Sequence, residues 1–162
     1  MPKVVSDSSP LIHLAKIGRL ELLKHFFGEI IVPEAVYKEC VTEGKGREDA
    51  KNIEKAKWIK VIRIKDKNLN KALAMVLDEG EAETITLALE ELADIILLDD
   101  YEARRIARNY RLNITGIIGI LIKAKYAGKI GSLKEELEKL KETGFWINAE
   151  LYTKILKEGG EL

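Results

Sequence analysis

Short, continuous runs of apolar residues recur along the chain, separated by longer segments with helical spacing. Runs of this kind predict strands buried on both faces of a sheet, as in parallel α/β folds. The clearest are Val4-Val5, residues 30–32 and residues 95–98, and Ile114 is expected to lie in a further, brief strand. Residues 59–64 alternate partly between apolar and polar, which indicates an edge strand.

Between these strands, apolar residues recur at the spacing of amphipathic helices, and capping residues, prolines and glycines mark the helix ends. The predicted helices span 9–24 (divided at Gly18), a short stretch after Pro33, 47–57, 69–77, 81–92, 101–110, 117–127, 132–143 and 148–157. This alternation predicts a three-layer α/β/α sandwich with a mainly parallel central sheet. We expect residues 1–130 to form this domain and residues 131–162 to form a C-terminal helical extension packed on it.

The composition of the chain indicates a single-domain protein without an internal disulfide or a membrane span. A chain of 162 residues suits one domain with a sizeable core. The 27 acidic and 27 basic side chains cancel, so any surface that attracts nucleic acid must be local. The single cysteine, Cys40, excludes an internal disulfide and favours a cytoplasmic location. No apolar run reaches the length of a membrane span and no signal peptide is evident, so no membrane partner is expected.

Acidic residues stand at the ends of predicted strands and near the starts of helices. In open α/β sheets, ligands bind in the crevice outside the carboxyl ends of the strands. The acids concerned are Asp7, Asp99 and Asp100 after strands, and Glu39, Glu81 and Glu83 on helices. A cluster of carboxylates suits Mg²⁺ or Mn²⁺, and such ions can promote phosphodiester cleavage. Without a cation, crowded carboxylates would repel one another.

Simpler roles are also compatible with these residues. Asp7 precedes a Ser-Ser-Pro segment where a helix begins, so it could act only as a helix cap. Glu81 and Glu83 complement the dipole at a helix start. Asp99 and Asp100 fit a cap with a solvated neighbour. The residues alone leave the metal-site and structural interpretations both open.

Five sequence blocks together resemble a PIN domain. They are Val-Val-Ser-Asp-Ser-Ser-Pro-Leu at 4–11, Val-Pro-Glu-Ala-Val-Tyr-Lys-Glu at 32–39, Gly-Glu-Ala-Glu at 80–83, Leu-Leu-Asp-Asp-Tyr-Glu-Ala-Arg at 97–104 and Thr-Gly-Ile-Ile-Gly-Ile-Leu at 115–121. The chain most resembles a PIN-like subfamily long catalogued as of unknown function and akin to the VapC toxins. The resemblance runs nearly end to end.

This resemblance implies a PIN-like nuclease domain over residues 1–130 that acts as a metal-dependent endoribonuclease. The protein would hydrolyse phosphodiester bonds of RNA as the toxin of a toxin–antitoxin pair. Its implied partners are RNA, an antitoxin protein and a second copy of the chain, and its implied cofactor is Mg²⁺ or Mn²⁺. Apolar residues beyond one core also favour a homodimer, namely Phe26, Phe27, Phe145 and Trp146.

The resemblance also implies a role for individual residues. The expected catalytic residues are Asp7, Glu39, Glu81, Asp99 and Asp100, and all of these except Glu39 are expected metal ligands. Ser6, Ser8, Glu83 and Thr115 are expected to support them. Arg104 and Arg108, which share a helix face, are expected to contact RNA phosphates or to pair with nearby acids such as Glu102.

Two other functions remain as alternatives. One is a catalytically inactive PIN-like module that binds RNA or protein. This alternative draws on two departures from many PIN toxins, which carry Asp where Glu81 stands and Thr-x-Asp where residues 98–100 stand. The other is a phospho-aspartyl enzyme, which requires a second Asp two residues after Asp7, where this chain has Ser9. Metal binding that depends on Asp7 would distinguish the nuclease from the inactive module.

Overall fold

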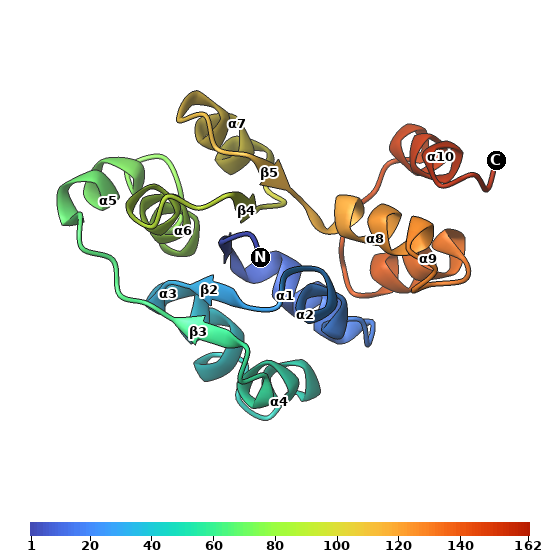
Figure 1. The fold of residues 1–162 in the computed structure, drawn as a ribbon, viewed down its shortest axis with the longest axis horizontal. Coiled ribbons are helices and arrows are strands. Elements are labelled where there is room, and N and C mark those ends of the chain that lie inside the picture. The colour runs from blue at the N-terminus through green and yellow to red at the C-terminus, as the bar shows by residue number, and fades with distance from the viewer.

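The computed structural model describes residues 1–162 and shows a five-stranded sheet between two layers of helices (Figure 1). The strand order is β3-β2-β1-β4-β5, and every neighbouring pair is parallel. The strands are β1 (Val4–Ser6), β2 (Ile30–Val32), β3 (Ile59–Val61), β4 (Ile95–Leu97) and β5 (Ile114–Thr115). The predicted α/β/α sandwich with a parallel sheet is therefore confirmed.

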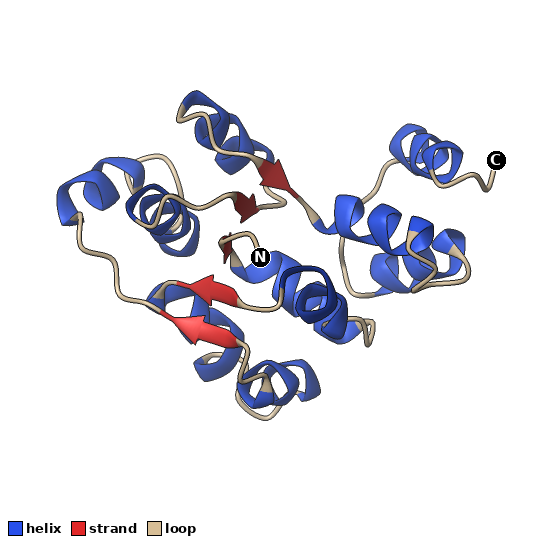
Figure 2. Cartoon of the chain, in the orientation of Figure 1, coloured by secondary structure: helices blue, strands red, loops and turns tan.

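Helices make up most of the remaining chain, while the strands are short (Figure 2). The helices are α1 (Ser8–Lys16), α2 (Glu21–Phe27), α3 (Glu34–Tyr37), the π-helix η1 (Lys38–Thr42), α4 (Glu48–Lys55), α5 (Lys67–Leu73), α6 (Glu79–Glu90), α7 (Tyr101–Asn109), α8 (Ile117–Tyr126), α9 (Leu133–Glu142) and α10 (Ala149–Glu158). None of them combines the length and the apolar character that a membrane span requires.

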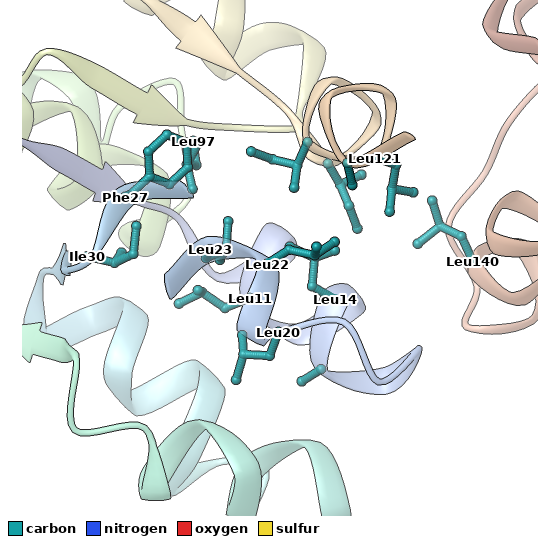
Figure 3. Close-up of a cluster of buried hydrophobic side chains, with 14 of the residues drawn as sticks. Leu11, Leu14, Leu20, Leu22, Leu23, Phe27, Ile30, Leu97, Leu121 and Leu140 are labelled. Carbon is teal, nitrogen blue, oxygen red and sulfur yellow. The ribbon is translucent and has the colours of Figure 1, made fainter. Parts of the chain in front are cut away.

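Successive strand residues point to opposite faces of the sheet, so the strands contribute to two separate cores. Val4 and Ile30 belong to the larger cluster, whereas Val5 and Ile31 belong to the smaller one. The larger cluster includes side chains of α1, α2, α8 and α9 (Figure 3). It also includes side chains of α10. The smaller cluster lies on the side of α5, α6 and α7. Burial on both faces explains why the strand segments are apolar without alternation.

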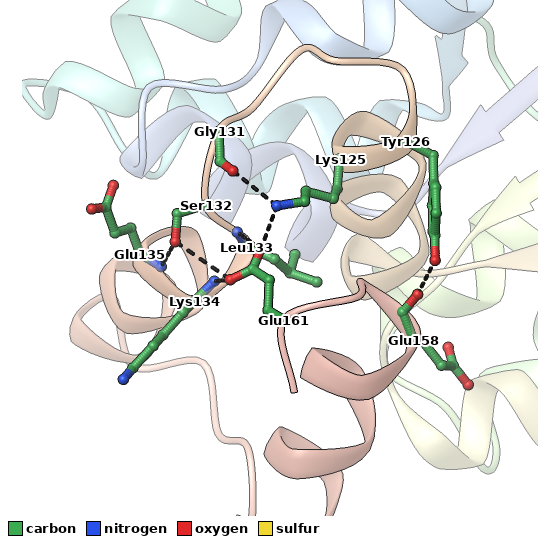
Figure 4. Close-up of polar contacts among 9 residues, drawn as sticks. All are labelled: Lys125, Tyr126, Gly131, Ser132, Leu133, Lys134, Glu135, Glu158 and Glu161. Carbon is green, nitrogen blue, oxygen red and sulfur yellow. Dashed lines mark hydrogen bonds and ion pairs between the residues drawn. The ribbon is translucent and has the colours of Figure 1, made fainter.

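The C-terminal extension packs on the larger of the two cores. Its side chains in that cluster include Leu133, Leu137, Leu140, Ile155 and Leu156. Glu161 then fastens the chain end, since its carboxylate accepts hydrogen bonds from the backbone N–H groups of Leu133 and Lys134 and from Lys125 Nζ (Figure 4). The two N–H groups belong to the first turn of α9, where no intrahelical partner exists.

Helix α6 starts earlier than predicted because a capping box forms at its N-terminus. Helix α6 begins at Glu79 rather than at Glu81, because Asp78 is the N-cap. Asp78 Oδ1 accepts a hydrogen bond from Glu81 N at 2.8 Å, and Glu81 Oε1 accepts one from Asp78 N at 3.2 Å. This capping box places Gly80 inside the first turn instead of before the helix.

The edge strand is also shorter than predicted. β3 ends at Val61, although the Ile62 amide still donates to the Val32 carbonyl at 2.9 Å. Its place at the edge of the sheet is confirmed.

Three of the four aromatic residues expected to provide spare apolar surface pack on the larger cluster, namely Phe26, Phe27 and Phe145, and only Trp146 is largely exposed. Phe27 is only 3% exposed and belongs to the larger cluster, so the prediction that it is spare surface is wrong. Phe26 lies beside it, with ring centroids 6.3 Å apart, and Lys123 Nζ of α8 stands 4.8 Å from the Phe26 ring. The reason is that α2 packs against α8, a contact that helical periodicity in one segment does not show.

Candidate active site

The carboxyl ends of β1 and β4 bring most of the predicted acidic residues to one cavity. These two strands pair with Ser6 opposite Leu97, and the Asp7 amide donates to the Leu97 carbonyl at 3.0 Å. The residues that follow the two strands therefore leave the sheet side by side. The cavity has a volume of about 460 Å³ and is lined by Asp7, Ser8, Ser9, Asp78, Glu81, Asp99, Asp100, Tyr101, Phe145 and Trp146.

Asp7 is the most buried acid of this cavity, with 5% of its surface exposed. It occupies the N-cap position of α1, but its side chain makes no capping hydrogen bond. Burial raises the pKa of Asp7 well above its ordinary value, and the hydrogen bond from the Ser8 backbone amide opposes this rise. The negative charges of Glu81, Glu39 and Asp78 raise the pKa further. A buried carboxyl among other carboxylates favours binding of a proton or a cation. A role as helix cap alone does not account for this placement.

Glu39 reaches the same region from η1, which is a π-helical turn. Such turns are rare in proteins as a whole, but those that occur are often found at functional sites. Its carboxylate accepts a hydrogen bond from Ser8 Oγ at 2.8 Å. Burial raises the pKa of Glu39, the Ser8 hydroxyl lowers it in part, and neighbouring acids raise it again. Glu39 also contacts α6 at Gly80, where an added Cβ would lie 2.0 Å from Glu39 Oε1 and 3.4 Å from Asp7 Oδ1.

The two glutamates of α6 have different surroundings. Glu81 lines the cavity and is held by the capping box with Asp78. Burial raises the pKa of Glu81 to about 7, the hydrogen bond with the Asp78 amide opposes the rise, and the charges of Asp78, Asp100 and Glu39 add to it. Glu83 does not line the cavity, and its Oε1 accepts a hydrogen bond from Ala35 N of α3 at 3.1 Å.

Asp99 and Asp100 both line the cavity but are held differently. Asp99 accepts hydrogen bonds from Ser9 Oγ at 2.9 Å and from Ile117 N at 2.8 Å, which tie the end of β4 to α1 and α8. Burial raises the pKa of Asp99, and these two hydrogen bonds lower it in part. Asp100 is exposed and caps α7, with Oδ2 accepting from Ala103 N at 3.0 Å. Asp99 is thus the more firmly positioned of the two, and Asp100 the more accessible.

Three predicted supporting residues lie outside the cavity lining, namely Glu83, Ser6 and Thr115. Ser6 Oγ donates to the Asp7 carbonyl at 2.8 Å and so contacts the backbone of that residue. Thr115 ends β5, where it pairs with Leu97. Ser8, by contrast, lines the cavity and bonds Glu39.

The two arginines predicted to contact RNA have separate environments. Arg104 is partly buried, and its Nη1 donates to the Leu98 carbonyl at 2.8 Å, just before Asp99. Arg108 is exposed on the same helix and forms no ion pair. The expected pairing with Glu102 is made by the neighbouring Arg105 instead, at 2.8 Å.

The oxygen atoms that line the cavity are of the type that binds a hard divalent cation, although they do not surround a common point. Carboxylate and hydroxyl oxygens line it, with no His, Cys, Lys or Arg. No group of three His, Cys, Asp or Glu side chains lies close enough to hold a metal ion together in this conformation. Binding an ion therefore requires some of these side chains to rotate.

Five residues of the cavity were not predicted as site residues from the sequence, namely Ser9, Asp78, Tyr101, Phe145 and Trp146. The Asp-x-x-Glu spacing of Asp78 and Glu81 is a capping-box pattern and could have revealed one of them. No local pattern connects Trp146 with the acids, because only the packing of the C-terminal extension brings it there.

Comparison with known proteins supports the fold and its class. A family model described as a PIN domain matches residues 3–161, and the function of that family is not known. No curated protein matches the chain. PIN domains are generally nucleases, which are hydrolases, and they typically use divalent metal ions. Since the match covers nearly the whole chain and the parallel α/β/α fold agrees with it, the chain belongs to the PIN-domain family.

Proposed function

We propose that this protein is a Mg²⁺- or Mn²⁺-dependent endoribonuclease that hydrolyses phosphodiester bonds of RNA. The observation that carries the proposal is the buried Asp7 carboxyl, which makes no capping bond and faces a cavity lined only by oxygen donors and aromatic rings. An acid in this position raises the energy of the folded chain unless a cation or a proton binds there. Its placement is therefore better explained by a ligand than by packing.

The proposed metal ligands are Asp7, Glu81 and one or both of Asp99 and Asp100, while Glu39 would orient a second ion or the water. When bound, such an ion lowers the pKa of a water molecule and stabilises charge on the leaving oxygen. The chain itself holds these acids in place through a set of short polar contacts. Ser8 bonds Glu39, Ser9 bonds Asp99, and Asp78 forms the capping box with Glu81.

The resemblance to VapC toxins supports a role as the toxin of a toxin–antitoxin pair. Its proposed partners are then RNA, an antitoxin protein and a second copy of the chain, in the cytoplasm. The alternative is a catalytically inactive module that binds RNA or protein. Two observations favour it: Glu81 stands where many PIN toxins have Asp, and no three acids converge in this conformation.

The test replaces Asp7 with Asn and measures RNA cleavage with added Mn²⁺. The substitution removes a charge at nearly constant volume, so the melting temperature without metal should stay the same or rise. Cleavage should fall by about 100-fold or more, because a site with few protein ligands has none to spare. Mn²⁺ affinity, measured by titration calorimetry, should fall with it.

The matched control is Asp66→Asn. Asp66 is an N-cap whose side chain accepts a hydrogen bond from Leu69 N, and Asn caps a helix about as well. This variant should cleave RNA like the wild type. Unchanged cleavage by a folded Asp7→Asn variant would contradict the proposed role of Asp7. Absence of cleavage by the wild type, across varied RNAs with Mn²⁺, would favour the binding module.

A further inference from the structure

The cavity that contains the acids also has an aromatic wall. Tyr101, Phe145 and Trp146 line it together with the carboxylates. Tyr101 is 74% exposed and Trp146 is 78% exposed, although both are large aromatic side chains. Rings of this size gain most when they are covered, so two open rings beside one cavity indicate a ligand that covers them.

Trp146 is held in this open position by its neighbours on either side. The Phe145 ring packs edge-on against the His13 ring of α1, with centroids 5.3 Å apart, and His13 Nδ1 lies 2.7 Å from Thr143 Oγ1. On the other side, Ile147 is buried in the larger core. The connection between α9 and α10 is therefore fastened to the helix that follows Asp7, and Trp146 projects from a fixed segment.

Tyr101 is positioned with similar firmness. It is the first residue of α7, directly after Asp100, whose side chain caps that helix. One aromatic ring thus adjoins a strand-end acid, and the other comes from the C-terminal extension. The extension contributes part of the cavity wall and does more than cover the core.

The charges of the cavity indicate how a nucleic acid would bind there. No lysine or arginine lines it, and Arg104, which adjoins Asp99, already bonds the Leu98 carbonyl. Phosphate groups therefore find no cationic side chain in the cavity, and without a bound cation its acids repel them. An aromatic ring, by contrast, stacks on the face of any unpaired base, and one such contact strengthens binding by roughly 10- to 100-fold.

We propose that Trp146 and Tyr101 form a stacking platform for an unpaired nucleobase beside the phosphodiester that is cleaved. The inference rests on the proposed ribonuclease function and identifies the side chains that would hold its RNA by base stacking. A base inside a duplex is covered by its neighbours and offers no free face, so paired RNA is a poor ligand. A protein partner over the same rings is the competing occupant.

The binding test uses the full chain carrying Asp7→Asn, so that bound RNA stays intact. A further Trp58→Phe substitution leaves Trp146 as the single tryptophan, because the chain has only these two. Titration with a single-stranded RNA oligonucleotide should quench the Trp146 emission to a plateau. The same sequence as a duplex should quench it little at equal concentration.

Substitutions then separate stacking from other contacts, with affinity measured by anisotropy of a labelled oligonucleotide. Trp146→Ala and Tyr101→Ala should each weaken binding by roughly 10- to 100-fold, whereas Trp146→Phe and Tyr101→Phe should retain most of the affinity. Tyr110→Ala is the matched control, since Tyr110 is an exposed tyrosine just past the other end of α7 and does not line the cavity.

Three results of the binding experiments would overturn the inference. The first is equal quenching by duplex RNA, and the second is unchanged RNA affinity of both alanine variants. The third is an emission spectrum showing that the Trp146 ring is buried in the free protein and becomes exposed on dilution. The last result would show that another copy covers the platform.

Cleavage assays separate this inference from the proposed function. Wild-type protein that binds single strands through Trp146 without cleaving them would contradict the ribonuclease alone, whereas full cleavage by Trp146→Ala would contradict the platform alone.

Discussion

Gly80 lies directly against the carboxylate of Glu39, since a Cβ atom at Gly80 would stand 2.0 Å from Glu39 Oε1. The same Cβ would be 3.4 Å from Asp7 Oδ1. The first turn of α6 therefore lies against two acids that come from η1 and from the end of β1. This close approach depends on the Asp78 capping box, which starts α6 early enough to bring the glycine to that point.

Replacing Gly80 with Ala should impair function more than folding. Alanine favours a helix by about 1 kcal/mol over glycine, and Glu39 can swing away because its carboxylate ends a flexible chain. Glu39 would then lose its hydrogen bond to Ser8 Oγ, and RNA cleavage should fall by roughly 10- to 100-fold. Activity and thermal melts of Gly80→Ala would be compared with Gly131→Ala, where a Cβ meets nothing within 4 Å. Equal activities of the two variants would rule out a role for Glu39 placement.

Arg104 and Arg108 should respond differently to substitution by alanine. Arg104→Ala leaves the Leu98 carbonyl without its side-chain donor, so urea unfolding should show a loss of about 1–3 kcal/mol. Arg108 is exposed and unpaired, so its loss should change stability by no more than about 0.5 kcal/mol. If Arg108 contacts phosphate, its removal should weaken the salt dependence of RNA binding. The slope of log binding constant against log salt concentration should become shallower by about one. An unchanged slope would exclude that contact.

Glu161 should stabilise the fold in a pH-dependent way. The hydrogen bond from Lys125 lowers the pKa of Glu161 to about 2, with burial opposing and the amides of Leu133 and Lys134 adding to the effect. Its carboxyl binds a proton less tightly in the folded than in the unfolded chain. The stabilisation is therefore complete above the ordinary pKa of 4.5 and is lost as the pH falls towards 2.

Unfolding of Glu161→Gln by urea would check this. At pH 7 the variant should be less stable than the wild type by on the order of 1 kcal/mol. The difference should shrink between pH 5 and pH 2. A difference that does not depend on pH would show that the charge of Glu161 is not what holds the chain end.

A homodimer remains a prediction, drawn from the resemblance to PIN toxins. Light scattering at tens of micromolar protein should give about twice the chain mass of 18.3 kDa. Trp146→Ala should leave that mass unchanged if the aromatic platform is free to bind RNA. A mass of one chain would contradict the dimer.

The sequence by itself determined the sheet and the edge at which the acids lie. Val4-Val5 and residues 95–98 are apolar without alternation, and a strand tolerates this only when both of its faces are buried, as in a parallel sheet. Acids that directly follow such strands must then lie at the carboxyl edge, whichever helices cover the sheet. Local patterns alone therefore place Asp7 and Asp99 at the same edge of the sheet, whereas the pairing of β1 with β4, which makes them neighbours, belongs to the tertiary structure.

Only the tertiary structure decided which other side chains meet them. Glu83 turns to the amide of Ala35 while Glu81 faces the cavity, and this choice depends on where the Asp78 cap starts α6. Trp146 reaches the acids because the α9–α10 connection packs on His13 of α1. Local spacing encodes the period of a helix and the face it buries. It does not encode which distant segment covers that face, because side-chain packing between layers settles the partner.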